Sequence, residues 1–210
     1  MTIFIASPAG RMEALLRPSS LANPRWAAVV CHPHPKFGGT MHNKVVFHTA
    51  KFLNSQGLPT LRFNFRGVGL SQGSFDGGRG ETDDVTAVLD YMAGCYPQCG
   101  LLVAGFSFGA WVGLRAACRD ARVAAGIAIG LPFSLMDTTF LQTCSKPKLF
   151  LQGTEDPFSP MAEVERIYRG IGNPKKLVWI LEADHFFEGQ LPALGRALVE
   201  SLRSQIFLGS

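Results

Sequence analysis

The sequence predicts a single α/β domain, in which helices cover both faces of a mainly parallel sheet. Two observations support this prediction: short apolar segments recur along the chain, and helical patterns separate most of them. With 210 residues, 47% of them hydrophobic, the chain can bury one sizeable core, and no linker rich in Pro, Gly or Ser divides it. We therefore expect residues 1–210 to form one domain.

Short apolar segments with the composition of strands buried on both faces recur along the chain. They are W-A-A-V-V-C (26–31), T-L-R-F-N-F (60–65), L-L-V-A (101–104), V-A-A-G-I-A-I (123–129), K-L-F-L-Q (148–152) and K-L-V-W-I-L (176–181). At the N-terminus, T-I-F-I (2–5) and E-A-L-L-R (13–17) flank the turn sequence S-P-A-G, which predicts an antiparallel hairpin at the sheet edge.

Helical periodicity appears between most of these segments. Residues 41–53 and 85–92 each place apolar side chains on one helical face, and we expect the second of these helices to start near Glu81. Similar patterns occur at 107–118, 160–170 and 191–206. Strands and helices that alternate in this way predict a parallel sheet, in which functional groups gather beyond the carboxyl ends of the strands.

Charge and composition argue against several classes of partner. The net charge of +4 is spread along the chain without a run of Lys or Arg, so we expect no nucleic acid partner. No apolar stretch approaches the roughly 20 residues that span a bilayer, so we expect no membrane partner. The N-terminal sequence M-T-I-F-I-A-S-P-A-G lacks the basic and apolar regions of a secretion signal. Together with an odd number of cysteines, this predicts a cytoplasmic protein with reduced thiols.

The cysteines and histidines do not form the patterns of a metal site. The cysteines are Cys31, Cys95, Cys99, Cys118 and Cys144. Cys95 and Cys99 lack a second pair at a zinc-like spacing, and no nearby carboxylate or third histidine completes a site with His32 and His34. We therefore expect neither a metal nor another cofactor.

The pattern G-x-S-x-G, which marks the nucleophilic serine of many esterases, occurs at 69–73 and at 105–109. Such a serine lies on a sharp turn between a buried strand and a helix. Ser107 fits, because L-L-V-A precedes it and A-W-V-G-L-R-A-A-C follows it as a plausible helix. Ser71 does not, because G-S-F-D-G-G-R-G is too rich in glycine to begin a helix. We expect Ser71 on a loop near the rim, with Arg66 either anchoring this loop or exposed at the surface.

A base and an acid for Ser107 are predicted further along the chain, since this architecture orders them as Ser, then Asp or Glu, then His. Asp156 follows one predicted strand and His185 follows the next, so both lie at carboxyl ends of strands. The remaining alternatives for the acid and the base are Glu155, Asp137, Asp184, His32, His34, His42 and His48. Asp184 is adjacent to His185, which places its carboxylate poorly for the far nitrogen of that ring.

The segment C-H-P-H-P-K-F-G-G (31–39) follows a predicted strand, at the position that supplies the second oxyanion donor of such a site. Neither proline has a backbone N–H, so after the first histidine of H-P-H-P only His34 can donate from the main chain. We predict an oxyanion hole formed by the N–H groups of His34 and Phe108, with Gly38 and Gly39 as alternatives to His34.

The motifs that carry a resemblance are C-H-P-H-P with G-G-T-M-H-N-K-V-V (31–46), F-N-F-R-G-V-G-L-S-Q-G (63–73) with G-E-T-D-D (80–84), G-F-S-F-G (105–109), G-T-E-D-P-F-S-P (153–160) and A-D-H-F-F (183–187). They resemble those of small bacterial α/β-hydrolases related to the dienelactone-hydrolase group, over most of the chain. The resemblance implies an α/β-hydrolase fold and a triad of Ser107, Asp156 and His185. Dienelactone hydrolase itself uses a cysteine nucleophile, so the serine here gives no support for lactone specificity.

These features together predict a serine hydrolase that cleaves a small-molecule ester through an acyl-enzyme. Residues 131–147, between two predicted strands, are too few for a cap domain. Apolar side chains expected near the pocket are Leu131, Phe133, Leu135, Met136, Phe140, Leu141, Phe106, Phe108, Phe158, Phe186 and Phe187. The alternatives are a hydrolase fold kept as a non-catalytic scaffold, and an acyltransferase or peptidase that uses the same triad.

Overall fold

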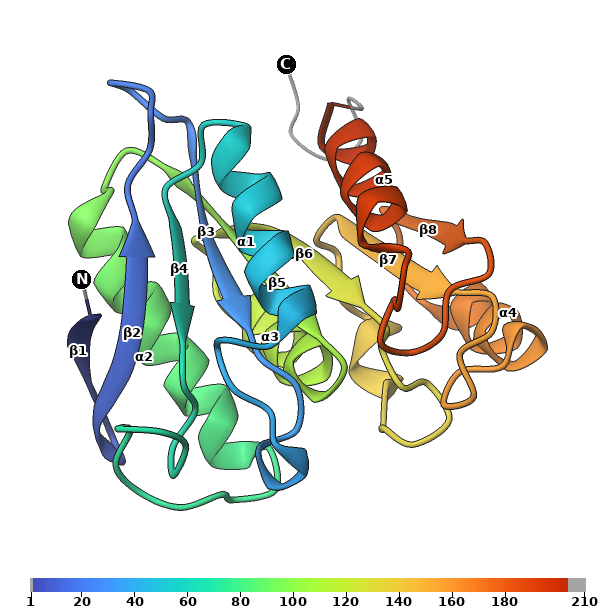
Figure 1. The fold of residues 1–210 in the computed structure, drawn as a ribbon, viewed down its shortest axis with the longest axis horizontal. Helices are drawn as coiled ribbons and strands as arrows, with labels where there is room; N and C mark the ends of the chain where they lie inside the picture. The colour runs from blue at the N-terminus through green and yellow to red at the C-terminus, as the bar shows by residue number, and fades with distance from the viewer. Residues whose placement is uncertain (1, 204–210) are drawn as a thin grey trace.

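A central sheet of eight strands, with helices on both faces, forms the core of residues 2–203, which are the residues described by the computed structural model (Figure 1). The strands are β1 (Thr2–Ser7), β2 (Gly10–Arg17), β3 (Trp26–Cys31), β4 (Thr60–Phe63), β5 (Gly100–Phe106), β6 (Val123–Ile129), β7 (Lys148–Gly153) and β8 (Lys175–Ile180). Their spatial order is β1-β2-β4-β3-β5-β6-β7-β8. β1 and β2 form the predicted antiparallel hairpin, and every strand from β4 to β8 in this order runs parallel.

The helices divide between the two faces of the sheet, as predicted (Figure 1). They are α1 (Lys44–Ser55), α2 (Arg79–Cys95), α3 (Phe108–Arg119), α4 (Met161–Gly170) and α5 (Leu191–Arg203), with short 3-10 helices at η1 (Pro35–Phe37) and η2 (Thr139–Leu141). Apolar side chains of α1 and α5 share one buried cluster, and those of α2, α3 and α4 belong to the other. Burial on both faces explains why the central strands are almost continuously apolar.

Several elements begin or end at residues other than those predicted. The strand predicted to reach residue 65 ends at Phe63, and the helix predicted from residue 41 begins at Lys44 because the Asn43 side chain caps it by accepting from Val45 N. The helix expected to start near Glu81 begins at Arg79, and the Glu81 carboxylate accepts from backbone N–H groups of the preceding loop. Positions 204–206 of the last predicted helix lie outside the described residues.

A disulfide corrects the expectation that all thiols are reduced. Cys118, near the end of α3, is bonded to Cys144, which precedes β7, whereas Cys31, Cys95 and Cys99 are free. The two bonded residues are 26 positions apart, and the fold brings their Cα atoms within 5.5 Å. No sequence spacing shows this, because the contact depends on how the segment between β6 and β7 returns along α3.

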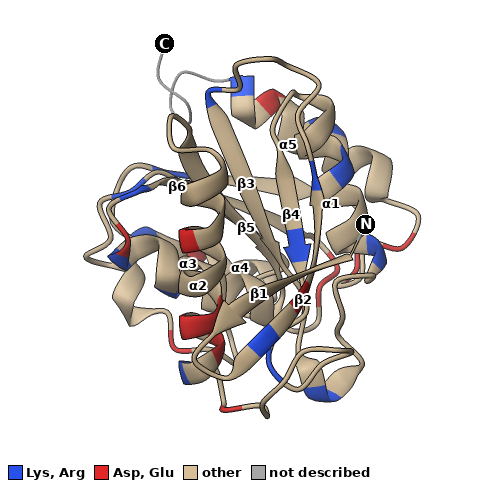
Figure 2. Ribbon diagram, turned by 90° about the vertical axis from the view of Figure 1, so that its left-hand side faces the viewer, with Lys and Arg blue, Asp and Glu red and all other residues tan. Residues whose placement is uncertain are grey.

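The charged residues are distributed over several elements. On the side of the molecule shown in Figure 2, Lys and Arg occupy separate segments, with Asp and Glu on neighbouring ones. Within residues 2–203, none of the helices combines the length and the apolarity of a membrane span.

Candidate active site

Ser107 lies on the sharp turn between β5 and α3. Its backbone has φ of +55° and ψ of −121°, a conformation that strains any residue with a side chain. The turn is held because Ser107 N donates to Ile129 O at 2.9 Å. A Cβ atom at Gly105 would lie 2.2 Å from Gly109 O, and one at Gly109 would lie 2.4 Å from His32 O. Both glycines of G-F-S-F-G are therefore needed for the close approach of strand and helix.

The structure brings the predicted serine, histidine and acid into one hydrogen-bonded line. His185 Nε2 lies 3.0 Å from Ser107 Oγ, and His185 Nδ1 lies 2.8 Å from Asp156 Oδ2. The side chains of His185 and Asp156 are only 6% and 0% exposed. The other carboxylate oxygen of Asp156 accepts from Phe158 N at 2.8 Å, which fixes its orientation. The arrangement can remove a proton from the serine and stabilise the resulting imidazolium.

The other candidate acids and bases are engaged elsewhere or exposed. Asp184 Oδ1 accepts from Glu188 N, and Asp137 Oδ1 accepts from the Thr139 N–H and hydroxyl. Glu155 and His42 are exposed, and His48 is half-buried on α1. None of these side chains has a hydrogen bond to Ser107 or His185 among the described residues.

A cavity of about 510 Å³ opens over Ser107 and His185, with walls from the loops that follow β3, β6, β7 and β8. The predicted pocket residues that line it are Leu135, Met136, Phe106, Phe108, Phe158 and Phe186. The others pack in the core or against it: Leu131, Phe133, Phe140, Leu141 and Phe187. No Asp, Glu, Lys or Arg lines this cavity within the described chain. A larger groove of about 710 Å³, between α1 and α5, is lined by none of the three triad residues.

The residues predicted to supply the oxyanion donors face the same cavity as Ser107. The rings of His34 and Phe108 are 4.9 Å apart, and both residues line the cavity. Neither backbone N–H has an acceptor among residues 2–203, whereas Gly39 N already donates to His34 O at 3.1 Å. His34 Nδ1 accepts from Lys36 N, so its side chain caps η1. Burial and the charge of Lys36 lower the pKa of His34, against an opposing effect of Glu81.

Comparison with known proteins identifies the family of the chain. The sequence matches the family model described as an alpha/beta hydrolase domain over residues 27–202. The chain belongs to the α/β-hydrolase family.

An uncharacterized protein of Rickettsia prowazekii is 35% identical over 95% of this α/β-hydrolase chain and 87% of its own length. The structure of an α/β serine hydrolase homologue from Coxiella burnetii has a TM-score of 0.91 and 38% identity, over 96% of this chain and 97% of that chain. A serine hydrolase without a lid from Xanthomonas campestris has a TM-score of 0.90 and 35% identity, over 97% and 93%. An esterase from Pyrococcus furiosus shares the fold, with a TM-score of 0.84 and 18% identity over 97% and 91%.

His32 of this α/β-hydrolase was an alternative base or metal ligand from the sequence, but it is buried and both ring nitrogens are engaged. Nδ1 lies 2.6 Å from Pro33 O, and Nε2 accepts from Phe65 N at 3.0 Å. Burial lowers the pKa of His32 to about 4, and the bond to Pro33 opposes this only in part. Within residues 2–203, no group of three or more His, Cys, Asp or Glu side chains could hold a metal ion.

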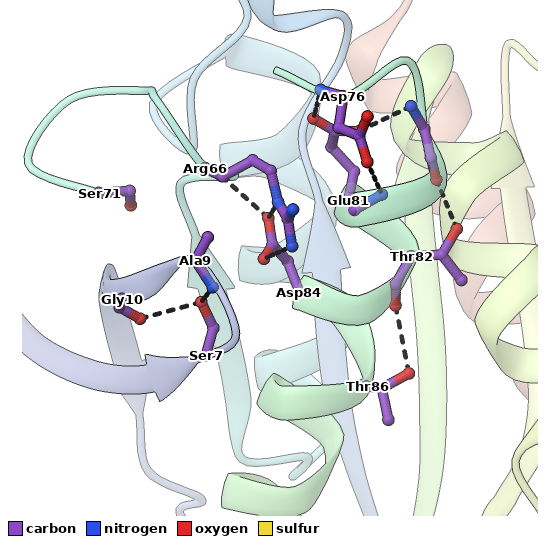
Figure 3. Close-up of polar contacts among 12 residues, drawn as sticks. Ser7, Ala9, Gly10, Arg66, Ser71, Asp76, Glu81, Thr82, Asp84 and Thr86 are labelled. Atoms are coloured by element: carbon purple, nitrogen blue, oxygen red, sulfur yellow. Dashed lines mark hydrogen bonds and ion pairs between the residues drawn. The ribbon is translucent and has the colours of Figure 1, made fainter. Parts of the chain in front are cut away.

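The other G-x-S-x-G segment of this α/β-hydrolase, residues 69–73, has a structural role. Ser71 is only 7% exposed; its hydroxyl donates to Asn64 O at 2.7 Å and accepts from Glu13 N at 2.9 Å. Ser71 lies on a loop, as expected, but it is buried and does not line the cavity, so the expectation that it lies near the rim is wrong. Arg66 reaches from the end of β4 to Asp84 on α2, with Nε and Nη2 at 3.0 and 2.9 Å from its two oxygens (Figure 3). This bond raises the pKa of Arg66, so the prediction of an anchoring arginine is the correct alternative.

Proposed function

We propose that this protein is a serine hydrolase of small carboxylic esters, with Ser107 as nucleophile, His185 as base and Asp156 as orienting acid. The observation that carries the proposal is the line of hydrogen bonds from Ser107 through His185 to Asp156, at the base of an apolar cavity. The strained backbone of Ser107 supports it, because such strain is retained where a side chain must be presented to substrate.

The reaction proceeds by acyl transfer to water. His185 Nε2 takes the proton as Ser107 Oγ attacks the ester carbonyl, and Asp156 stabilises the imidazolium. The N–H groups of Phe108 and His34 hold the developing oxyanion. His185 then protonates the leaving alcohol, and a water activated by the same ring hydrolyses the acyl-enzyme.

The cavity favours a neutral, apolar substrate. A carboxylate on the acyl group would find no Lys or Arg among the lining residues, and its burial without a partner is costly. The volume of about 510 Å³ lies within the range of sites for small molecules. A closer relation to the dienelactone-hydrolase group and a cytoplasmic location remain predictions, and the Cys118–Cys144 bond is unusual for that compartment.

The test is the hydrolysis of p-nitrophenyl acetate, butyrate and octanoate by the wild type, Ser107→Ala and the control Ser74→Ala. We expect the wild type and the control to turn over, and mass spectrometry to trap an acyl group on Ser107. Turnover by Ser107→Ala at the wild-type rate would refute the proposal. A wild type inert to all esters and to serine-directed probes would favour a scaffold, and transfer of the acyl group to an added alcohol or amine would favour an acyltransferase.

A further inference from the structure

The buried side chain of His32 is joined to the backbone on both sides, at the point where β3 ends. Its Nδ1 lies 2.6 Å from the carbonyl oxygen of Pro33, and its Nε2 is 3.0 Å from Phe65 N. The Phe65 N–H is a donor, so Nε2 must be the acceptor and Nδ1 must carry the proton. His32 therefore donates to Pro33 O and fixes the direction of that carbonyl.

The direction of the Pro33 carbonyl also sets the direction of the His34 N–H. These two groups belong to one peptide unit, which is planar and trans, so its C=O and N–H point in opposite directions. His32 does not line the cavity, whereas Pro33 and His34 do. Because the Pro33 carbonyl points toward the His32 ring, the His34 N–H points away from that ring. The hydrogen bond to the carbonyl also polarises the N–H of the same peptide unit.

Gly39 confines the same carbonyl from a second side. A Cβ atom at Gly39 would lie 2.1 Å from Pro33 O, so only glycine allows this approach. Gly39 N donates to His34 O at 3.1 Å, which closes the loop over the peptide unit. The Pro33 carbonyl is thereby hydrogen-bonded by the His32 ring and closely approached by the Gly39 backbone.

We infer that His32 is a positioning residue of the oxyanion hole, which sets the His34 N–H by holding the Pro33 carbonyl. The inference rests on the proposed function, because it requires that the His34 N–H acts on an oxyanion. It uses the neutral ring with the proton on Nδ1, since a protonated ring could not accept from Phe65 N. Burial, which lowers the pKa of His32 to about 4, keeps this form at neutral pH.

Two amide substitutions separate the two hydrogen bonds of His32. The side-chain amide of His32→Asn reaches about as far as Nδ1 and can still donate to Pro33 O, while that of His32→Gln reaches about as far as Nε2 and can still accept from Phe65 N. Each variant loses one bond and should melt at a lower temperature than the wild type. We expect His32→Gln to lower kcat about 10- to 100-fold with KM changed less than 3-fold. The reason is that the His34 N–H would bind the oxyanion only in the transition state, so its misdirection affects kcat and not substrate binding. His32→Asn should keep kcat within about 3-fold of wild type.

The measurements are kcat and KM for p-nitrophenyl butyrate, the melting temperature, and the affinity for a trifluoromethyl ketone that forms a tetrahedral adduct on Ser107. Ketone affinity should fall with kcat in His32→Gln. Leu101→Ala is the control for lost stability and should keep kcat. Leu101 is buried at the amino end of β5, whereas Ser107 follows the carboxyl end of that strand. If Ser107→Ala is inactive but both His32 variants have the same kcat, whether retained or lost, the inference is overturned and the proposed function stands. A wild type without esterase activity would instead overturn the proposed function, and the inference with it.

Discussion

The segments 69–73 and 105–109 share the pattern G-x-S-x-G, but their glycines have different structural roles. At 105–109 the glycines leave room for backbone: a Cβ atom at either would meet carbonyl oxygen at 2.4 Å or less. At 69–73 the glycines have φ of +57° and +85°, so they allow left-handed turns in a loop. The five-residue pattern is identical in both places, yet only one of the two segments joins a strand to a helix.

The two hydroxyl groups differ accordingly. Ser71 donates its proton to Asn64 O and accepts from Glu13 N, so both functions of its hydroxyl are used by buried backbone. Ser107 Oγ lies 3.0 Å from His185 Nε2 at the base of a cavity. The surroundings of a serine, and not the five letters around it, thus decide whether it can be a nucleophile.

The largest expected difference between the two serines is in labelling and turnover. Ser107→Ala should lower kcat by about 10⁴-fold or more and abolish labelling by a fluorophosphonate, because the nucleophile is removed. The Ser71→Ala variant should still be labelled on Ser107 and should keep kcat within about 3-fold of wild type, since Ser71 does not line the cavity. Peptide mapping of the labelled site checks this, and a label found on Ser71 would reverse the comparison.

The second prediction tests the acid of the predicted triad, Asp156, which acts on Ser107 only through His185. Asp156→Asn should lower kcat by roughly 10³- to 10⁴-fold, since the amide favours the wrong tautomer of His185. The matched control is Asp184→Asn, one residue before His185, where the carboxylate accepts from Glu188 N. Steady-state kinetics of both variants decides between them; an equal loss in Asp184→Asn would contradict the assignment of Asp156.

The loop that carries Ser71 should respond to substitution through stability. Asp84 is fully buried, and its carboxylate accepts from the Arg66 backbone N–H and guanidinium. Asp84→Ala leaves the Arg66 charge without its partner and should lower the free energy of unfolding by about 3–5 kcal/mol. Asp83→Ala removes the exposed neighbouring acid and should change it by less than about 0.5 kcal/mol. Urea unfolding measures both values, and equal values would show that the pair does not hold this loop.

The elements of the fold follow from local patterns, and this explains why they could be predicted. Apolar runs and helical periodicity identified the strands and helices, and the rule that functional groups gather at carboxyl ends of parallel strands pointed to Asp156 and His185. The strand predicted over 60–65 ends at Phe63. Asn64 N still donates to Glu13 O of β2, but the next residue, Phe65, donates its N–H to the His32 ring and not to a neighbouring strand.

The features that could not be predicted all depend on contacts between distant parts of the chain. The Cys118–Cys144 bond and the choice of Asp84 as the partner of Arg66 join separate elements, and neither has a local sequence pattern. His32 could be read only as a base or a ligand, because the acceptor role of its Nε2 depends on Phe65, 33 positions away. Polar residues with several possible partners are thus the least predictable part of this site.

The smallest expected effect concerns the stability contributed by Ser71 itself. Ser71→Ala removes two hydrogen bonds and leaves Glu13 N without its acceptor, so the free energy of unfolding should fall by about 1–3 kcal/mol. Ser74→Ala, in an exposed part of the same loop, is the matched control and should leave stability within about 0.5 kcal/mol of wild type. If Ser71→Ala instead lowers kcat while its unfolding curve coincides with that of Ser74→Ala, then Ser71 acts in the reaction, and the distinction between the two G-x-S-x-G segments fails.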